Sequence, residues 1–112
     1  MTDKAKKYLV DILKAIELTE LFSSDVAGFE AYKADLKTKS AVERQLAIIG
    51  EAVSQFKKEE TSYKITHALQ IVGLRNRLIH AYDSTEDTVV WAILKKHLPN
   101  LKMEILELIQ EM

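Results

Sequence analysis

The chain has 112 residues, which is the usual size of one domain, so we expect a single domain over residues 1–112. It carries 16 Lys and Arg residues against 17 Asp and Glu residues, and 47% of its residues are hydrophobic. This composition is typical of a folded globular protein and lacks the basic excess of proteins that bind duplex DNA. The absence of cysteine excludes thiol catalysis, disulfides and thiolate metal sites. Because no apolar run is long enough to span a bilayer and no signal-peptide pattern occurs, we expect a cytoplasmic protein without membrane contact.

Apolar residues recur at steps of three and four along most of the chain, which predicts helices. The expected helices span residues 3–22, 29–36, 40–57, 63–82 and 86–112. Pro99 should break the last of them near Leu98 into two roughly collinear pieces, because proline lacks the N–H that a helix interior needs. We therefore predict an all-α fold, a small up-and-down bundle of four to five helices.

Gly50 lies inside the long predicted helix, where glycine costs about 1 kcal/mol relative to alanine. A glycine that is kept at this cost usually has a packing reason. We therefore expect a second helix to pack closely against the long helix at this position.

Residues 73–83 read GLRNRLIHAYD and differ from the rest of the chain, because two of its three arginines lie there. On a helical wheel Arg75 falls between two groups of apolar residues, Tyr82 lies beside it and His80 lies on the polar side. An arginine within an apolar arc is costly unless it is paired or faces a polar cavity. Glu51 on the long predicted helix is one possible partner.

These residue types suit the cleavage of RNA. Arginine offers a permanent charge and a rigid fork for two phosphate oxygens, and histidine can move a proton near neutral pH. Cleavage of RNA needs both functions and requires no metal. However, positions 75 and 80 point about 140° apart on a straight helix. Either the helix distorts there, or two copies of the chain meet and each contributes part of the site.

Each signal also has a structural alternative. Arg75 could form an ion pair in the core, His80 could be a surface or capping histidine, and Tyr82 could be a tyrosine at the core edge. Trp91 is expected to pack in the core or in a dimer rather than to stack on a base, and His67 and His97 are far apart in the sequence. No set of residues has the spacing of a metal site, and no cofactor is expected. Three lysines near the N-terminus could hold RNA, although a solvated helix end is the simpler interpretation: Lys4, Lys6 and Lys7.

The stretch from Arg75 to Tyr82 closely resembles the signature of the HEPN superfamily, in particular its HepT-like toxins. That motif consists of an arginine, a polar residue that is often asparagine, three more residues, a histidine, one residue and a tyrosine. The segment AVERQLAIIGEA, residues 41–52, is similar to the long central helix of that family, and Val90–Trp91 with Leu98–Pro99 resembles its C-terminal helices. The segment 59–64 lacks the proline-rich turn that the family often has there.

The resemblance implies a helical bundle that forms a symmetric homodimer, with the motif at the dimer cleft. It implies a metal-independent endoribonuclease that acts as the toxin of a type VII-like toxin–antitoxin pair. By carry-over, His80 would transfer the proton, Arg75 would hold or stabilise the scissile phosphate, and Asn76 would orient one of them or the RNA. Tyr82 would be the residue to which a nucleotidyltransferase antitoxin transfers AMP, which silences the toxin.

Two other readings of the same residues remain open. In one, the chain is a non-catalytic subunit that binds nucleotides or presents a substrate to a minimal nucleotidyltransferase. In the other, it is a purely structural helical dimer in which Arg75 forms a core ion pair.

Overall fold

The computed structural model describes residues 1–80 and 87–112, without the side chains of residues 79 and 80. Every regular element in these two ranges is helical, which confirms the all-α prediction. The elements are α1 (Asp3–Ser23), α2 (Phe29–Ala34), α3 (Leu36–Glu59), α4 (Ala68–His80), α5 (Asp87–Ala92), the π-helical turn η1 (Ile93–His97) and α6 (Leu98–Gln110). Within the described part of the chain, no helix is both long enough and apolar enough to cross a membrane.

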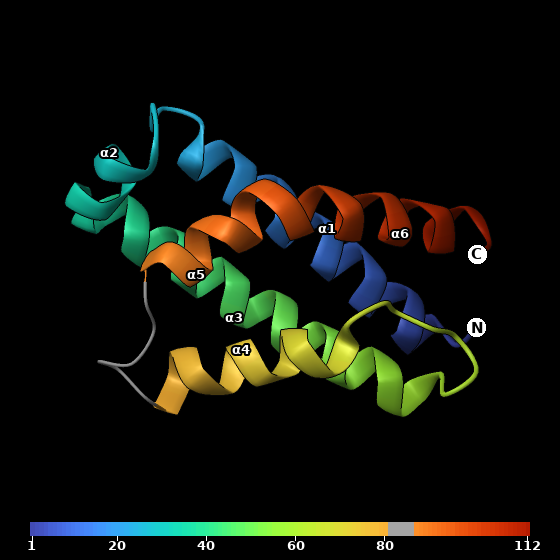
Figure 1. The fold of residues 1–112 in the computed structure, drawn as a ribbon. Helices are drawn as coiled ribbons and strands as arrows, with labels where there is room; N and C mark the ends of the chain where they lie inside the picture. Colours follow the sequence, from blue (N-terminus) through green and yellow to red (C-terminus); the bar gives the residue numbers. More distant parts are fainter. Residues whose placement is uncertain (81–86) are drawn as a thin grey trace.

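The helices α1 and α3 pack along each other and form the centre of the bundle (Figure 1). Helix α6 packs on α1, and α4 packs on α3 from the other side. The periodic apolar stripes of these helices meet in one core, whose largest fully buried side chains come from α1, α2, α3, α5 and α6. They include Leu9, Ile12, Ile16, Tyr32, Ile49, Phe56 and Ile105. Because α4 has α3 as its main neighbour, much of its surface stays outside the core.

Two helices begin at positions that differ from the prediction. Helix α3 begins at residue 36 rather than 40, because the carboxylate of Asp35 accepts hydrogen bonds from the Thr38 backbone N–H at 3.0 Å and from the Thr38 hydroxyl at 2.7 Å. Helix α4 begins at Ala68 rather than at residue 63. The preceding His67 has a φ of 62°, which is a left-handed backbone conformation that no right-handed helix can contain.

The C-terminal segment follows the predicted break. Helices α5 and α6 are joined by η1 without a loop, and Pro99 lies in the first turn of α6 (Figure 1). A proline is tolerated there because the first N–H groups of a helix have no partner within it. The helical path therefore continues through Leu98, and the predicted break takes the form of a π-helical turn that ends at His97.

Trp91 lies in a small aromatic cluster between α2 and α5. Its ring centroid is 5.5 Å from that of Tyr32 and 6.2 Å from that of Phe29. The ammonium group of Lys95 lies 4.7 Å from the centroid of the Trp91 ring. The prediction that Trp91 serves packing is thus confirmed.

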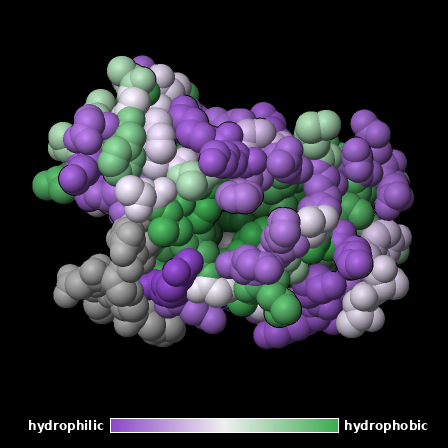
Figure 2. All heavy atoms as spheres, in the orientation of Figure 1, coloured by the Kyte–Doolittle hydropathy of each residue, from purple (hydrophilic) through white to green (hydrophobic). Residues whose placement is uncertain are grey.

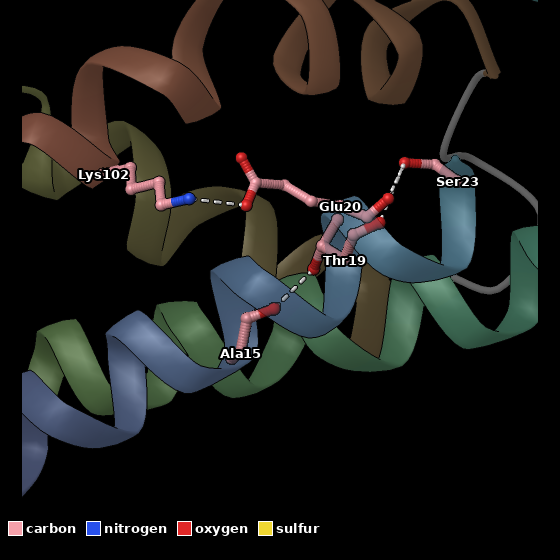
Figure 3. A network of polar contacts seen from close by, with 5 residues as sticks. All are labelled: Ala15, Thr19, Glu20, Ser23 and Lys102. Carbon is pink, nitrogen blue, oxygen red and sulfur yellow. Dashed lines mark hydrogen bonds and ion pairs between the residues drawn. The ribbon is translucent and has the colours of Figure 1, made fainter.

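Polar contacts also hold α6 against α1 (Figure 3). Lys102 of α6 donates to the Glu20 carboxylate of α1 at 2.8 Å. Within α1, the buried Thr19 hydroxyl donates to the carbonyl oxygen of Ala15 at 2.7 Å, which satisfies it inside the core. An ion pair therefore connects the end of α1 to α6, and hydroxyl groups near that end donate to carbonyl oxygens of α1 itself.

Candidate active site

Arg75 of α4 is paired with Glu51 of α3, the partner that the sequence indicated. The Nη2 atom of Arg75 lies 2.5 Å from the Oε2 atom of Glu51, and Nη1 donates to the side-chain oxygen of the neighbouring Asn76 at 2.7 Å. The Arg75 side chain is 28% exposed and that of Glu51 is 46% exposed. This pair is therefore partly exposed, and it differs from the buried ion pair that the purely structural reading assumes.

Gly50 explains how Arg75 comes so close to α3. Gly50 is buried, and a Cβ atom built on it would clash with the Cβ of Arg75 and lie 3.1 Å from the carbonyl oxygen of Ile71. Both of these atoms are fixed by the α4 backbone, so no side-chain rotation would relieve the contact. The prediction of close helix packing at Gly50 is confirmed, and the residue packed against it is Arg75.

Arg75 also lines an open groove of about 520 Å³ that extends over α1 and α3. Arg44 and Glu51 line the same groove, together with the half-buried Ile48. Arg44 was not singled out from the sequence, although positions 44, 48 and 51 share one face of α3 on a helical wheel. The groove thus presents three cations, Arg44, Arg75 and Lys14, beside two carboxylates, Asp11 and Glu51, of which Glu51 is paired with Arg75.

One nitrogen of Arg75 has no partner in the described structure. Its Nε atom is buried and makes no hydrogen bond there. An arginine has five N–H donors, so the bonds to Glu51 and Asn76 leave others available. Glu51 and Asn76 therefore orient the guanidinium group without using up its capacity to donate.

The structure describes only two of the four predicted site residues with their side chains. Arg75 and Asn76 are brought together, whereas the side chain of His80 and the whole of Tyr82 lie outside what the structure describes. Helix α4 is α-helical from Ala68 to His80. Positions 75 and 80 therefore stay about 140° apart on one regular helix, and the distorted-helix alternative finds no support between them.

The N-terminal lysines that could have held RNA form ion pairs within the chain. The three N-terminal lysines each face an acidic side chain, with Lys4 near Glu59, Lys6 near Asp3 and Lys7 near Asp11. Among the side chains that the structure describes, no group of three or more His, Asp or Glu residues could hold a metal ion.

Two histidines that the sequence separates do meet in the structure. The rings of His67 and His97 lie 6.5 Å apart between their centroids. The sequence analysis set both aside because of their separation along the chain, and no local pattern could have joined them.

The fold and this site define a class: small all-α proteins that present a paired arginine and a following polar residue from a surface helix beside a groove. The family described as "Ribonuclease HepT-like" has a sequence model that matches residues 12–108 of this chain. The match covers most of the chain, so the protein belongs to the HepT-like ribonuclease family of the HEPN superfamily.

Curated proteins from archaea support the assignment. The chain is 39% identical over 101 residues to "Probable ribonuclease HepT" from Thermococcus cleftensis, which covers 87% of this chain and 88% of that protein. It is 31% identical over 108 residues to a "Putative RNase" from Methanocaldococcus jannaschii, which covers 96% and 92% of the two chains. It also matches a "Gamma-glutamylcyclotransferase and putative RNase" from the same organism at 31% identity over 113 residues, where it spans the whole of this chain but only 50% of that protein. No solved structure matches the chain significantly.

Proposed function

We propose that this protein is a metal-independent endoribonuclease that acts as the toxin of a type VII-like toxin–antitoxin pair. Membership of the HepT-like ribonuclease family supports the ribonuclease activity. The observation that carries the assignment to residues is the Arg75 guanidinium, which is oriented by Glu51 and Asn76 at the edge of an open groove. A structural arginine would be expected to use its charge inside the core, and this one is partly exposed.

In the proposed reaction the RNA supplies its own nucleophile. The 2′-hydroxyl oxygen attacks the adjacent phosphorus, the bond from phosphorus to the 5′-oxygen breaks, and a 2′,3′-cyclic phosphate and a 5′-hydroxyl end form. His80 accepts the 2′-hydroxyl proton, and a protonated His80, of the same copy or of the second copy of the chain, supplies a proton to the leaving 5′-oxygen. Arg75 stabilises the charge that gathers on the phosphoryl oxygens, and Asn76 holds the arginine in place. No step of this reaction needs a metal ion.

The site is proposed to be completed by a second copy of the chain. On the regular helix α4, positions 75 and 80 face directions about 140° apart. One straight helix therefore cannot aim both residues at one phosphate, whereas two helices related by a two-fold axis can each supply one of them. The proposed active form is a symmetric homodimer.

Regulation is proposed to act at Tyr82. A nucleotidyltransferase antitoxin would transfer AMP from ATP to the phenol oxygen, with formation of the oxygen–phosphorus bond and release of pyrophosphate. The phenol proton would go to a base of the transferase. The modification adds bulk and negative charge close in sequence to His80, which would repel the RNA backbone.

The test is cleavage of an end-labelled single-stranded RNA by the purified protein in buffer that contains EDTA. Wild-type protein should cut the RNA, and both Arg75→Ala and His80→Ala should lose 100-fold or more in rate, as is typical for loss of a charge-stabilising or proton-transfer group (about 10²–10³). Lys33→Ala is the matched control, because it removes one positive charge from an exposed position on α2. Equal activity of all four proteins would contradict the assignment.

The alternative of a non-catalytic binding subunit predicts a different outcome. In that case wild type and His80→Ala would be equally inert, and the variant would bind nucleotides more weakly. Modification is tested separately, by mass spectrometry after incubation with a candidate nucleotidyltransferase antitoxin and ATP. Tyr82→Phe should prevent the addition of AMP, and Tyr8→Phe on α1 should not.

A further inference from the structure

A second cavity lies on another face of the molecule, between α4 and the rod formed by η1 and α6. Its volume is about 410 Å³, which is within the range of ligand sites. Figure 2 shows an apolar hollow in the middle of this face, surrounded by polar side chains. Its floor is made by apolar residues of α3, α4 and α6: Leu46, Ile49, Ile71, Leu74, Leu98 and Leu101.

The mouth of this cavity is polar and carries two imidazole rings. His67 and His97 both line it, with ring centroids 6.5 Å apart and ring planes at 72°. The loop before α4 is anchored to α6, because the backbone N–H of Thr66 donates to the Glu104 carboxylate at 3.0 Å and its hydroxyl donates at 2.6 Å. His67 is therefore held next to the cavity by a contact between distant parts of the chain.

Two backbone irregularities converge at the same mouth. His67 has a φ of 62°, in a left-handed region that costs energy for a residue with a Cβ atom. His97 is the last residue of the π-helical turn η1. Such irregularities are enriched at functional sites, and here they come from two elements that the fold brings together. The cavity thus has the character of a built site.

We propose that this cavity binds one unstacked base of the RNA, an inference that rests on the proposed ribonuclease function. Bases of single-stranded RNA are recognised by stacking on aromatic rings and by hydrogen bonds along their edges. The two imidazoles supply the rings. Gln70 and Asn100 line the cavity and supply amide groups for the edge of a base.

The charges around the cavity favour a nucleotide over an apolar peptide side chain. Arg77 and Glu104 line the cavity, and the Glu104 carboxylate already accepts hydrogen bonds from Thr66. The exposed Lys95 and Lys96 lie in η1 beside His97. These cations suit the phosphates on either side of a bound base. Arg77 follows Arg75 by two residues on α4, so this cavity and the groove beside Arg75 lie on different sides of one helix. An RNA strand that crosses α4 could therefore reach both.

The experiment measures binding of a fluorescently labelled DNA tetranucleotide, which has bases and phosphates but no 2′-hydroxyl and so cannot be cleaved by the proposed reaction. Gln70→Trp places an indole at the mouth of the cavity from an exposed position of α4. Leu69→Trp is the matched control, because it adds the same group to the same helix at a side chain that is 87% exposed and does not line the cavity. Gln70→Trp and His97→Ala should each weaken binding about tenfold, as expected for loss of a stacked base, and Leu69→Trp should bind like wild type.

Equal affinity of wild type, Gln70→Trp and His97→Ala would overturn the inference. A change in dimer mass with Gln70→Trp, at unchanged nucleotide affinity, would also overturn it and would identify the cavity as a protein contact. Failure of this inference can be distinguished from failure of the proposed ribonuclease function, because the RNA cleavage assay tests that function separately. Loss of tetranucleotide binding only in the cavity variants supports the base site even if no RNA is cut, and unchanged binding refutes it even if RNA is cut at Arg75.

Discussion

Replacement of Gly50 by alanine tests the contact that places Arg75. The added methyl group would clash with the Cβ of Arg75 and would lie 3.0 Å from its Cγ and 3.1 Å from the carbonyl oxygen of Ile71. Overpacking of this kind costs about 1–3 kcal/mol, and the upper part of that range applies because two of the three atoms are fixed to the α4 backbone. Alanine in place of glycine in a helix returns about 1 kcal/mol. The net loss should be about 1–2 kcal/mol of unfolding free energy.

Gly73→Ala provides the matched control. Gly73 lies on α4, two residues before Arg75, and a Cβ built on it meets nothing within 4 Å. This variant should be more stable than wild type by about 0.5–1 kcal/mol, because it gains helix propensity without a clash. The two alanine variants should therefore differ by about 1.5–3 kcal/mol, although each adds the same single methyl group.

Urea unfolding followed by circular dichroism measures this difference. A slope of about 1–3 kcal/mol per molar urea makes the expected separation of the two midpoints about 0.5 M or more. RNA cleavage by the folded protein provides the second readout, because Gly50→Ala should displace Arg75 and lower kcat by tenfold or more, in line with the roughly 100-fold effect of a 1 Å misplacement. If Gly50→Ala proves as stable and as active as Gly73→Ala, α3 and α4 do not meet at Arg75 and the argument for its placement fails.

Three further variants probe charges and polar groups of the bundle. Glu51→Gln should cost less than about 1 kcal/mol of stability, because the ion pair is partly exposed. The same variant should lower kcat more than it raises KM. A loss of several kcal/mol of stability would show that the pair is structural. Tyr32→Phe should leave the melting temperature unchanged or raise it, because the buried Tyr32 hydroxyl has no hydrogen-bond partner in the described structure; a clear fall would reveal a partner. Burial raises the pKa of Glu43, an effect that Lys39 opposes and Asp87 reinforces. The folded state therefore binds the proton more tightly than the unfolded state, and Glu43→Gln should be more stable than wild type at pH 7. This difference in stability should shrink as the pH falls through the raised pKa towards the unfolded value of about 4.3. Urea midpoints that keep a constant difference across this pH range would contradict the prediction.

Much of the fold was predictable because helix formation leaves a local pattern. The apolar stripes of α1 and α3 recur every three or four residues, so their existence and buried faces follow from the sequence. Errors arose at the ends. Residues 37–40 are polar and gave no apolar signal, and the early start of α3 depends on the hydrogen bonds that Asp35 accepts from Thr38. The start of α4 depends on the left-handed backbone of His67, and a histidine gives no sequence signal for that conformation.

The candidate site was predictable to a similar extent. Arg75 stood out because a charge interrupts an apolar arc. Glu51 was one possible partner, and close helix packing was expected at Gly50, although the helix packed there was not identified from the sequence. That this ion pair lies partly in solvent was not predictable, since exposure depends on what covers α4. Arg44 was missed only because the analysis of α3 followed its apolar residues.

The amino-acid order alone determined which segments coil, which faces are apolar, and which motif links the chain to the HepT-like ribonucleases, because each of these depends on residues within a few turns of one helix. Only the tertiary structure decided that the loop at Thr66 is anchored to α6 and that His67 meets His97 above an apolar cavity. Those contacts join residues that are 30 or more positions apart. They depend on the distance between the packed helices and on the direction that the π-helical turn gives to α6. Neither of these can be inferred from a local sequence repeat.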